Sequence, residues 1–217
     1  MLFLGSGLSE VDVTPKILEI TRVADGTTID VILVPLTRKL ASLQIDTKWW
    51  QIPGVPEKVR SQEIDHGYKW AKRIGELTSN NSRWYRAIAV QTDDDNIQGA
   101  MIYWLNTRSF IHQNEGAIFV ESLATAPCNR ERIVTLPEYR GVGTGLLLAA
   151  VIHSYKLGLG GRVNLNSTND PRTISFYETR GFVHCGYDGD EDEEKLPRFE
   201  LSAEAAQKWL NDEGYEL

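Results

Sequence analysis

The residues best suited to chemistry form a short glycine-rich run, Arg140-Gly141-Val142-Gly143-Thr144-Gly145. Three glycines in such close succession carry an entropic cost, and close approach of another group to the backbone is a physical reason to accept it. The apolar run Leu146 to Leu157 follows directly and predicts a buried helix. Successive N–H groups at a helix start attract an anion, and the helix dipole favours negative charge there. The run therefore predicts a site for a diphosphate.

Two familiar phosphate-binding loops do not fit this run. The P-loop needs GxxxxGK followed by Ser or Thr, which the sequence lacks. The dinucleotide fingerprint GxGxxG needs a third glycine where Leu146 stands. The run instead resembles the signature of the GNAT superfamily of N-acetyltransferases: Gln or Arg, two residues of any type, Gly, one residue, then Gly or Ala. The associated Pro-x-Tyr precedes it as Pro137-Glu138-Tyr139.

This resemblance implies that acetyl-CoA is the co-substrate and that the glycine-rich run holds its diphosphate. The implied amides belong to Val142, Gly143, Gly145 and Leu146. The full implied segment comprises Arg140, Gly141, Val142, Gly143, Thr144, Gly145 and Leu146. A surface loop that binds nothing is the alternative interpretation.

A strand before the run resembles the fourth strand of the GNAT fold, Phe119 to Thr125. Its end implies that backbone groups of Leu123, Ala124 and Thr125 pair with the pantetheine arm and polarise the acetyl carbonyl. After the run, the stretch Asn169 to Phe182 resembles a segment in which Asn169 contacts the cofactor. The spacing from that Asn to the Tyr is one residue longer here than in the commonest pattern.

The same segment contains Tyr177, for which the resemblance implies the role of general acid. An amine that attacks a thioester expels a thiolate, and a nearby phenol can lend that thiolate a proton. The amine must be neutral when it attacks, so a carboxylate is a sensible base, and Glu121 is the acidic residue of its strand. Two alternatives stay open: Tyr177 as a packing residue, and Glu121 as a structural or substrate-orienting carboxylate.

The elements around these residues predict an α/β protein with the GNAT fold, a mixed and mostly antiparallel sheet with helices on both faces. Residues 1 to 24 are expected to form an extra strand or an irregular arm. A helix is expected from Pro56 to Ser79, ending at Asn80 and Asn81, and its apolar positions recur every three to five residues. Strands are expected at Thr28–Leu36, Trp84–Gln91, Gln98–Leu105, Ala117–Thr125, Arg162–Ser167, Phe182–Tyr187 and Pro197–Leu201.

Further expectations concern the connections. The polar turn Thr92 to Asn96 predicts a β-hairpin, and helices are expected at Pro171–Arg180 and Ser202–Leu210. An insertion around Asn129 to Leu136 lengthens the connection that is short in most GNAT sequences. A β-bulge near Glu121 is also expected, because GNAT strands often carry one there. The acidic stretch Asp188 to Glu194 is either a solvated loop or an attractor for cationic substrates.

Bulk properties narrow the class of protein. The chain has 217 residues, of which 41% are hydrophobic, and it is expected to form a single domain over residues 1 to 217. A net charge of -7 argues against nucleic acid as a partner. The two cysteines, Cys128 and Cys185, have no metal-ligand spacing, so no metal site is expected. The sequence shows no signal peptide or membrane segment, which favours a cytoplasmic location.

These observations together predict a transferase, an acetyl-CoA-dependent N-acetyltransferase that acts on the primary amine of a small molecule or protein. The alternative is a GNAT-fold module that binds acetyl-CoA or another protein without catalysis. A different acyl donor or an alcohol acceptor is the rival among enzymes. Either a monomer or a homodimer is compatible with the sequence.

Overall fold

The computed structural model describes residues 17–80, 83–189 and 195–215. Its strands are β1 (Ile17–Arg22), β2 (Thr28–Pro35), β3 (Tyr85–Gln91), β4 (Ile97–Arg108), β5 (Gly116–Thr125), β6 (Tyr139–Arg140), β7 (Val163–Asn166), β8 (Val183–Asp188) and β9 (Leu196–Leu201). Its helices are α1 (Arg38–Leu40), α2 (Glu57–Arg60), α3 (Trp70–Ser79), α4 (Val142–Lys156), α5 (Pro171–Glu178) and α6 (Ala203–Asp212), with a π-helical turn η1 (Ala41–Asp46) and a 3-10 turn η2 (Pro127–Asn129).

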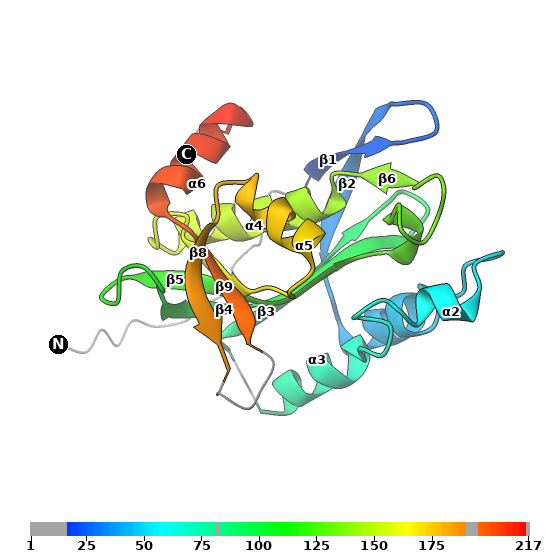
Figure 1. Ribbon diagram of the computed structural model, residues 1–217, viewed down its shortest axis with the longest axis horizontal. Coiled ribbons are helices and arrows are strands. Elements are labelled where there is room, and N and C mark those ends of the chain that lie inside the picture. The colour runs from blue at the N-terminus through cyan, green and yellow to red at the C-terminus, as the bar shows by residue number, and fades with distance from the viewer. Residues whose placement is uncertain (1–16, 81–82, 190–194, 216–217) are drawn as a thin grey trace.

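Within the described ranges these nine strands form one sheet in the order β6-β1-β2-β3-β4-β5-β7-β9-β8 (Figure 1). Only the pair β5 and β7 is parallel, and the other neighbours are antiparallel. The expected mixed, mostly antiparallel sheet is therefore confirmed.

Helices cover both faces of this sheet, because successive side chains of a strand point to opposite faces. On β4, Met101 and Tyr103 lie in the hydrophobic core that contains α4 and α6. Ala100 and Ile102 of the same strand lie in a second core with η1 and α3. Figure 1 shows α4 and α5 on one side of the sheet and α3 on the other. The chain thus forms a three-layer α/β fold.

Helix α4 is apolar on all sides, which is typical of a helix buried within a protein. It packs on the sheet under α5, and the side chains from Leu146 to Ile152 are all buried. The expected helix began at Leu146, whereas the structure begins it at Val142. Val142 to Gly145 of the glycine-rich run therefore form the first turn of this helix, after Arg140 in β6 and Gly141 at the N-cap.

The chain before β2 forms an additional strand, which decides between the two alternatives for that region. Strand β1 pairs with β2 through a turn at Asp25 and Gly26, and with β6 on its other side. Gly26 has a φ of +69°, and the Asp25 carboxylate accepts a hydrogen bond from the Thr27 backbone N–H. Residues 1–16 of the expected arm lie outside the described residues.

The expected hairpin at Thr92 to Asn96 is also confirmed and joins β3 to β4. Asp95 adopts a left-handed φ of 63°, as a tight turn requires. The Asp94 carboxylate accepts hydrogen bonds from the hydroxyl of Thr92 and the amide of Asn96, which holds the turn closed.

The predicted helix from Pro56 to Ser79 is wrong. The structure has a short α2, then a run of turns, and α3 begins only at Trp70. Asp46 of η1 explains this start, because its carboxylate accepts from the N–H groups of Trp70 and Ala71 at 3.0 and 3.1 Å. A partner outside the local sequence thus fixes the helix start. The predicted helix end is correct to Asn80, and Asn81 lies outside the described residues.

The later elements match their predicted ranges to within a few residues. Asp170 caps α5 by accepting from the Arg172 amide at 2.8 Å, and Ser202 caps α6 by accepting from Ala205. The expected loop from Thr125 to Pro137 contains η2. In the part of the chain that the structure describes, no helix has the length and apolar character needed to cross a bilayer.

Candidate functional site

A cleft opens where β5 and β7 part. The two strands pair only from Ile118 with Val163 to Val120 with Leu165, although β5 continues to Thr125. The cleft that fills this gap has a volume of about 1210 Å³. Its walls come from the ends of β5 and β7, the first turns of α4 and α5, the segment 62–70, and the insertion 129–132. Segments far apart in the sequence therefore share one cavity.

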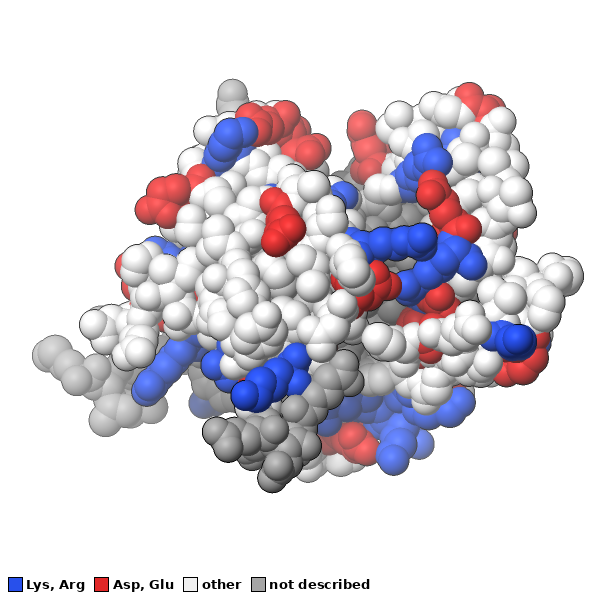
Figure 2. Space-filling model, viewed as in Figure 1, with Lys and Arg blue, Asp and Glu red and all other residues white. Residues whose placement is uncertain are grey.

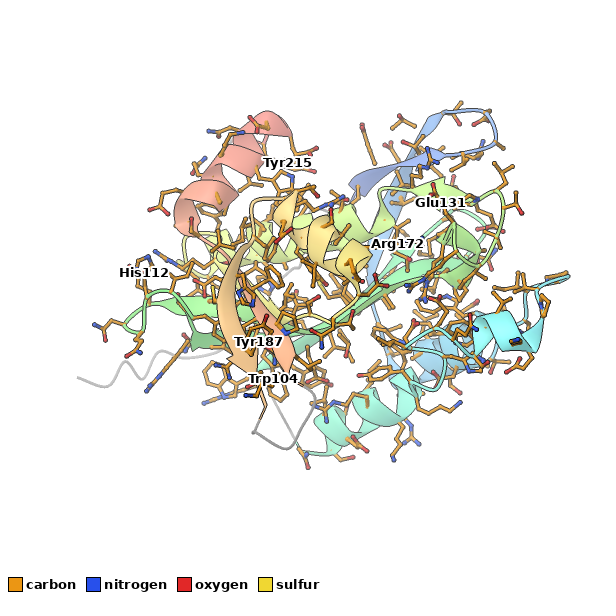
Figure 3. All side chains as sticks on the ribbon, in the orientation of Figure 1. Trp104, His112, Glu131, Arg172, Tyr187 and Tyr215 are labelled. Carbon is orange, nitrogen blue, oxygen red and sulfur yellow. The ribbon has the colours of Figure 1, made fainter. Side chains whose placement is uncertain are left out.

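Figure 2 shows Lys and Arg side chains gathered in a hollow on the face where Figure 1 places α5 and β6. Arg132, Arg140, Arg172 and Arg180 are among the residues that line the cleft. Figure 3 labels Arg172 at α5 and Glu131 in the segment that leads to β6. The Arg172 side chain forms no ion pair with a described residue, so it presents positive charge to the cleft.

The three glycines of the run serve three different purposes. Gly141 precedes α4 with a φ of +89°, a left-handed conformation that favours glycine. A Cβ on Gly143 would lie 3.3 Å from the Phe176 ring, at the wall of the cleft. A Cβ on Gly145 would lie 3.0 Å from Leu18 of β1. Only the first two glycines therefore shape the wall of the cleft, and the third permits close packing of helix and strand.

The start of α4 determines which amides face the cleft. The first N–H groups of a helix lack partners within the helix. They belong here to Val142, Gly143 and Thr144, all of which line the cleft. The Gly145 amide instead donates to the Gly141 carbonyl at 2.8 Å, and Leu146 is fully buried in the core. The sequence-based assignment of Gly145 and Leu146 to the diphosphate is thus corrected, because the helix begins earlier than expected.

Arg140 and Gly141 also line the cleft. Arg140 forms an ion pair with Glu131 at 2.7 Å, but both side chains are well exposed. Exposed pairs of this kind are weak, so Arg140 can exchange Glu131 for another anion at little cost.

The end of β5 presents its backbone edge to the cleft. The Ala126 amide donates to Gln98 beside β4 at 2.8 Å, so alternation turns the N–H and C=O groups of Leu123 and Thr125 away from β4 and toward the gap. Leu123, Ala124 and Thr125 all line the cleft. The Thr125 carbonyl already accepts two hydrogen bonds from Arg130, at 3.0 and 2.6 Å. The groups that remain for a ligand are those of Leu123 and the Thr125 amide.

Asn169 does not belong to the lining of the cleft, in contrast to the role that the resemblance implied. Its side-chain amide donates to the Lys195 carbonyl at 3.1 Å and joins the start of α5 to the segment before β9. Ser167, Thr168 and Asp170 line the cleft in its place.

Glu121 lies at a β-bulge, because Ile102 pairs with Ser122 whereas Tyr103 pairs with Val120. The expected bulge is thereby confirmed. Arg73 of α3 binds both carboxylate oxygens at 2.7 and 2.8 Å, and the Trp104 indole N–H donates at 2.6 Å. Burial raises the pKa of Glu121, but these hydrogen bonds outweigh burial and hold its pKa below the ordinary value. Three donors thus hold Glu121 as an ionised carboxylate with little tendency to take up a proton.

Tyr177 lies near the end of α5, packed in an aromatic cluster. Its ring centroid lies 5.3 Å from Phe176, 5.6 Å from Phe182 and 6.1 Å from Phe199. The side chain is 7% exposed, and it lines the cleft. Burial raises the pKa of Tyr177 to about 12. The hydroxyl therefore keeps its proton at neutral pH, as a general acid must.

The insertion is held against the cleft by a cluster of charged side chains that spacing in the sequence does not signal. Arg130 forms ion pairs with Glu63 at 2.7 Å and with Asp65 at 2.5 Å. Arg132 forms ion pairs with Glu63 at 2.6 Å and with Asp170 at 2.9 Å. Glu63 and Arg130 are nearly buried, so their pairing is strongly constrained. The one local feature of the sequence that points to this cluster is the Arg-Glu-Arg stretch 130–132 within the insertion.

Helices α4 and α5 are joined beside the same cleft. Arg180 donates to the Thr144 hydroxyl at 3.1 and 2.7 Å, and its guanidinium lies 3.8 Å from the centroid of the Phe176 ring. This contact fixes the first turn of α4 against α5. Among the described residues, no group of His, Cys, Asp and Glu side chains is arranged to hold a metal ion.

Comparison with solved structures shows the GNAT fold. A spermidine N-acetyltransferase chimera of SpeG from Vibrio cholerae and hSSAT is 18% identical, with a TM-score of 0.55 over 83% of this chain and 98% of that one. A putative GNAT-family acetyltransferase from Desulfovibrio desulfuricans is 18% identical, with a TM-score of 0.51 over 80% and 99%. An uncharacterised protein from Bacillus halodurans is 13% identical, with a TM-score of 0.57 over 90% and 95%.

No protein-family model and no curated protein sequence matches the chain. At these identities the similarity to solved structures concerns the fold. The chain thus has the α/β architecture of the GNAT acetyltransferases, with a cleft between its two parted parallel strands.

Proposed function

We propose that this chain is an acetyl-CoA-dependent N-acetyltransferase, formed as one domain, that acts on the primary amine of a small molecule or protein. One observation carries the proposal: the gap between β5 and β7 and the first turn of α4 share a single cleft. A strand edge with unpaired backbone groups suits an amide-containing arm. A helix start with open N–H groups suits a diphosphate.

The residues present fit acetyl-CoA in two respects. The amides of Val142, Gly143 and Thr144 would bind the diphosphate, with Arg140 and Arg172 as nearby cations. The backbone of Leu123 and the Thr125 amide would bind the pantetheine arm. When bound, acetyl-CoA supplies an activated acetyl group as a thioester.

Two side chains would then serve the transfer. Tyr177 would give its proton to the departing thiolate, because its raised pKa keeps it protonated. We assign Glu121 a positioning role rather than that of the base, since Arg73 and Trp104 already occupy its oxygens. The amine would lose its proton to solvent.

Isothermal titration with acetyl-CoA and CoA tests the cofactor site. The native protein is compared with Gly143→Asp and with Gly143→Asn, which adds the same bulk without charge. We expect micromolar binding to the native protein, weaker binding to Gly143→Asn and none to Gly143→Asp. A thermal melt of each variant checks folding, because a Cβ here must displace the Phe176 ring slightly.

The alternative, a module that binds acetyl-CoA without turnover, predicts the same titration but no chemistry. Release of free CoA thiol in the presence of a primary-amine library separates the two. Amine-dependent thiol release supports the enzyme, whereas tight binding without thiol release over a broad library supports the binding module. Absence of acetyl-CoA binding to the native protein contradicts both.

A further inference from the structure

The half of the cleft next to α3 differs in chemistry from the half next to α4. We call it the acceptor half, and it is lined by Gln62, Ile64, Asp65, Tyr68, Glu121 and Ser122. It adjoins the bulge of β5, through the hydrogen bond between the Tyr68 hydroxyl and the Ser122 hydroxyl at 2.9 Å. An amine that reaches the strand gap from this side meets these residues.

Each of the two carboxylates of the acceptor half is already paired with a guanidinium group. Both oxygens of Asp65 accept from Arg130, at 2.6 and 2.5 Å. Both oxygens of Glu121 accept from Arg73, one of them also from Trp104. A second ammonium group on an acceptor would therefore need to displace a guanidinium from a half-buried or buried ion pair. Breaking such pairs is costly because it leaves a charge uncompensated.

The rest of the described surface of the acceptor half carries no charged side chain, and Ile64 and Tyr68 give it apolar and aromatic groups. Ile64 is 75% exposed, although it lies between two residues, Glu63 and Asp65, that Arg130 holds in place. Tyr68 packs edge-on against Trp70 with 5.1 Å between ring centroids. An isoleucine held in solvent at the wall of a cleft offers apolar contact to a ligand.

We infer that the acceptor is a primary monoamine with an uncharged apolar or aromatic body, rather than a diamine or polyamine. This inference rests on the proposed function. In the reaction, the neutral amine nitrogen attacks the thioester carbonyl carbon, so a C–N bond forms and the C–S bond breaks. The thiolate takes the Tyr177 proton, and the nitrogen loses a proton to water. The products are an uncharged N-acetyl amide and the CoA thiol, and water restores the tyrosine proton.

The test compares hexylamine with 1,6-diaminohexane, which differ by one ammonium group, and includes 2-phenylethylamine and spermidine. We expect kcat/KM for hexylamine and 2-phenylethylamine to exceed that for the diamine at least tenfold. Ile64→Asp places an unpaired carboxylate on the wall and should narrow or reverse this ratio. Ile64→Asn is the control of equal size without charge, and it should lower turnover of hexylamine without raising that of the diamine.

A higher kcat/KM for 1,6-diaminohexane or spermidine in the native protein overturns the inference. The inference is also overturned if Ile64→Asp and Ile64→Asn change the ratio of kcat/KM for hexylamine to that for 1,6-diaminohexane by the same factor. Titration of acetyl-CoA into the same samples separates this failure from that of the proposed function. If the protein binds acetyl-CoA but prefers diamines, only the inferred class of acceptor is overturned. If it does not bind acetyl-CoA, the proposed function is overturned together with the inferred class of acceptor.

Discussion

Arg132 and Asp170 form an ion pair of 2.9 Å between the two segments that leave the parted strands. Arg132 belongs to the insertion after β5, and Asp170 caps the helix after β7. Strands β5 and β7 separate beyond Val120 and Leu165, and both members of the ion pair line the resulting cleft. The pair therefore links the insertion to the start of α5, and we call the insertion the strap.

We predict that this strap limits the exchange of cofactor. Asp170→Asn keeps the helix cap, because Asn caps as well as Asp, but removes the ion pair. Arg132→Gln removes the arginine of the same ion pair. A partly exposed pair contributes on the order of 1 kcal/mol, so each variant should raise both association and dissociation rates of CoA about fivefold with little change in Kd. Stopped-flow fluorescence measures both rates.

Lys208→Gln is the control for this experiment, because it removes an exposed ion pair with Asp212 on α6, outside the cleft. It should leave both rates unchanged. The double variant should resemble Arg132→Gln, because that change alone breaks the ion pair with Asp170 and also the one with Glu63. A change in dissociation alone, with an equal change in Kd, would identify Arg132 as a ligand of the cofactor and contradict the strap.

Tyr177→Phe should lower kcat by about a hundredfold or more, because the thiolate then leaves without a proton donor. Acetyl-CoA binding should stay within about twofold, and the aromatic packing with Phe182 and Phe199 is kept. Since the pKa of Tyr177 is about 12, native activity should rise with pH as the amine deprotonates and should not fall before pH 10. A loss of rate between pH 8 and 10 with intact protein would contradict this assignment.

Glu121→Gln separates positioning from base catalysis. The folded-state pKa of Glu121 is depressed, so its ionised form contributes stability that is present above its unfolded pKa and is lost as pH falls through the folded pKa. The variant should therefore lose about 2 kcal/mol in urea unfolding at neutral pH, and this difference should shrink at pH 3 to 4. If Glu121 only holds Arg73 and Trp104 in place beside the cleft, Glu121→Gln should raise the KM for the amine by a larger factor than it lowers kcat. A fall in kcat alone, by a hundredfold or more, would instead identify the base.

His153 on α4 should make the protein sensitive to mild acid. It is 1% exposed, its Nδ1 lies 2.9 Å from the Tyr103 hydroxyl, and burial lowers its pKa to about 4. The unfolded chain binds this proton near pH 6.5, so stability falls as pH drops from about 6.5 to about 4, by on the order of 3 kcal/mol.

His153→Asn should flatten this part of the curve of unfolding free energy against pH, because an amide can accept from Tyr103 without titrating. His112→Asn, in an exposed turn between β4 and β5, is the control and should leave the curve unchanged (Figure 3). An equal slope in the native protein and His153→Asn would show that other groups cause the acid sensitivity.

Local patterns in the sequence determined most of the architecture. The hairpin at Asp94 and Asp95, the cap of α5 by Asp170 and the buried helix after Gly141 all depend on interactions within a few residues. Tyr177, which the resemblance singled out, lies on α5 and lines the cleft. Such features are predictable because their partners are neighbours in the chain.

The parts that the sequence could not determine depend on residues far apart. Asp46 starts α3 from 24 residues away, which the apolar period of Pro56 to Ser79 concealed. Arg73 occupies the Glu121 carboxylate from 48 residues away, and Arg130 reaches Asp65 across 65 residues. Ion pairs between distant segments leave no periodic trace in a single sequence. The amino-acid sequence thus determined the buried helix and its glycine-rich start. Only the tertiary structure decided which carboxylates are paired with guanidinium groups and how the insertion is tied to α5, because those partners lie far apart in the chain.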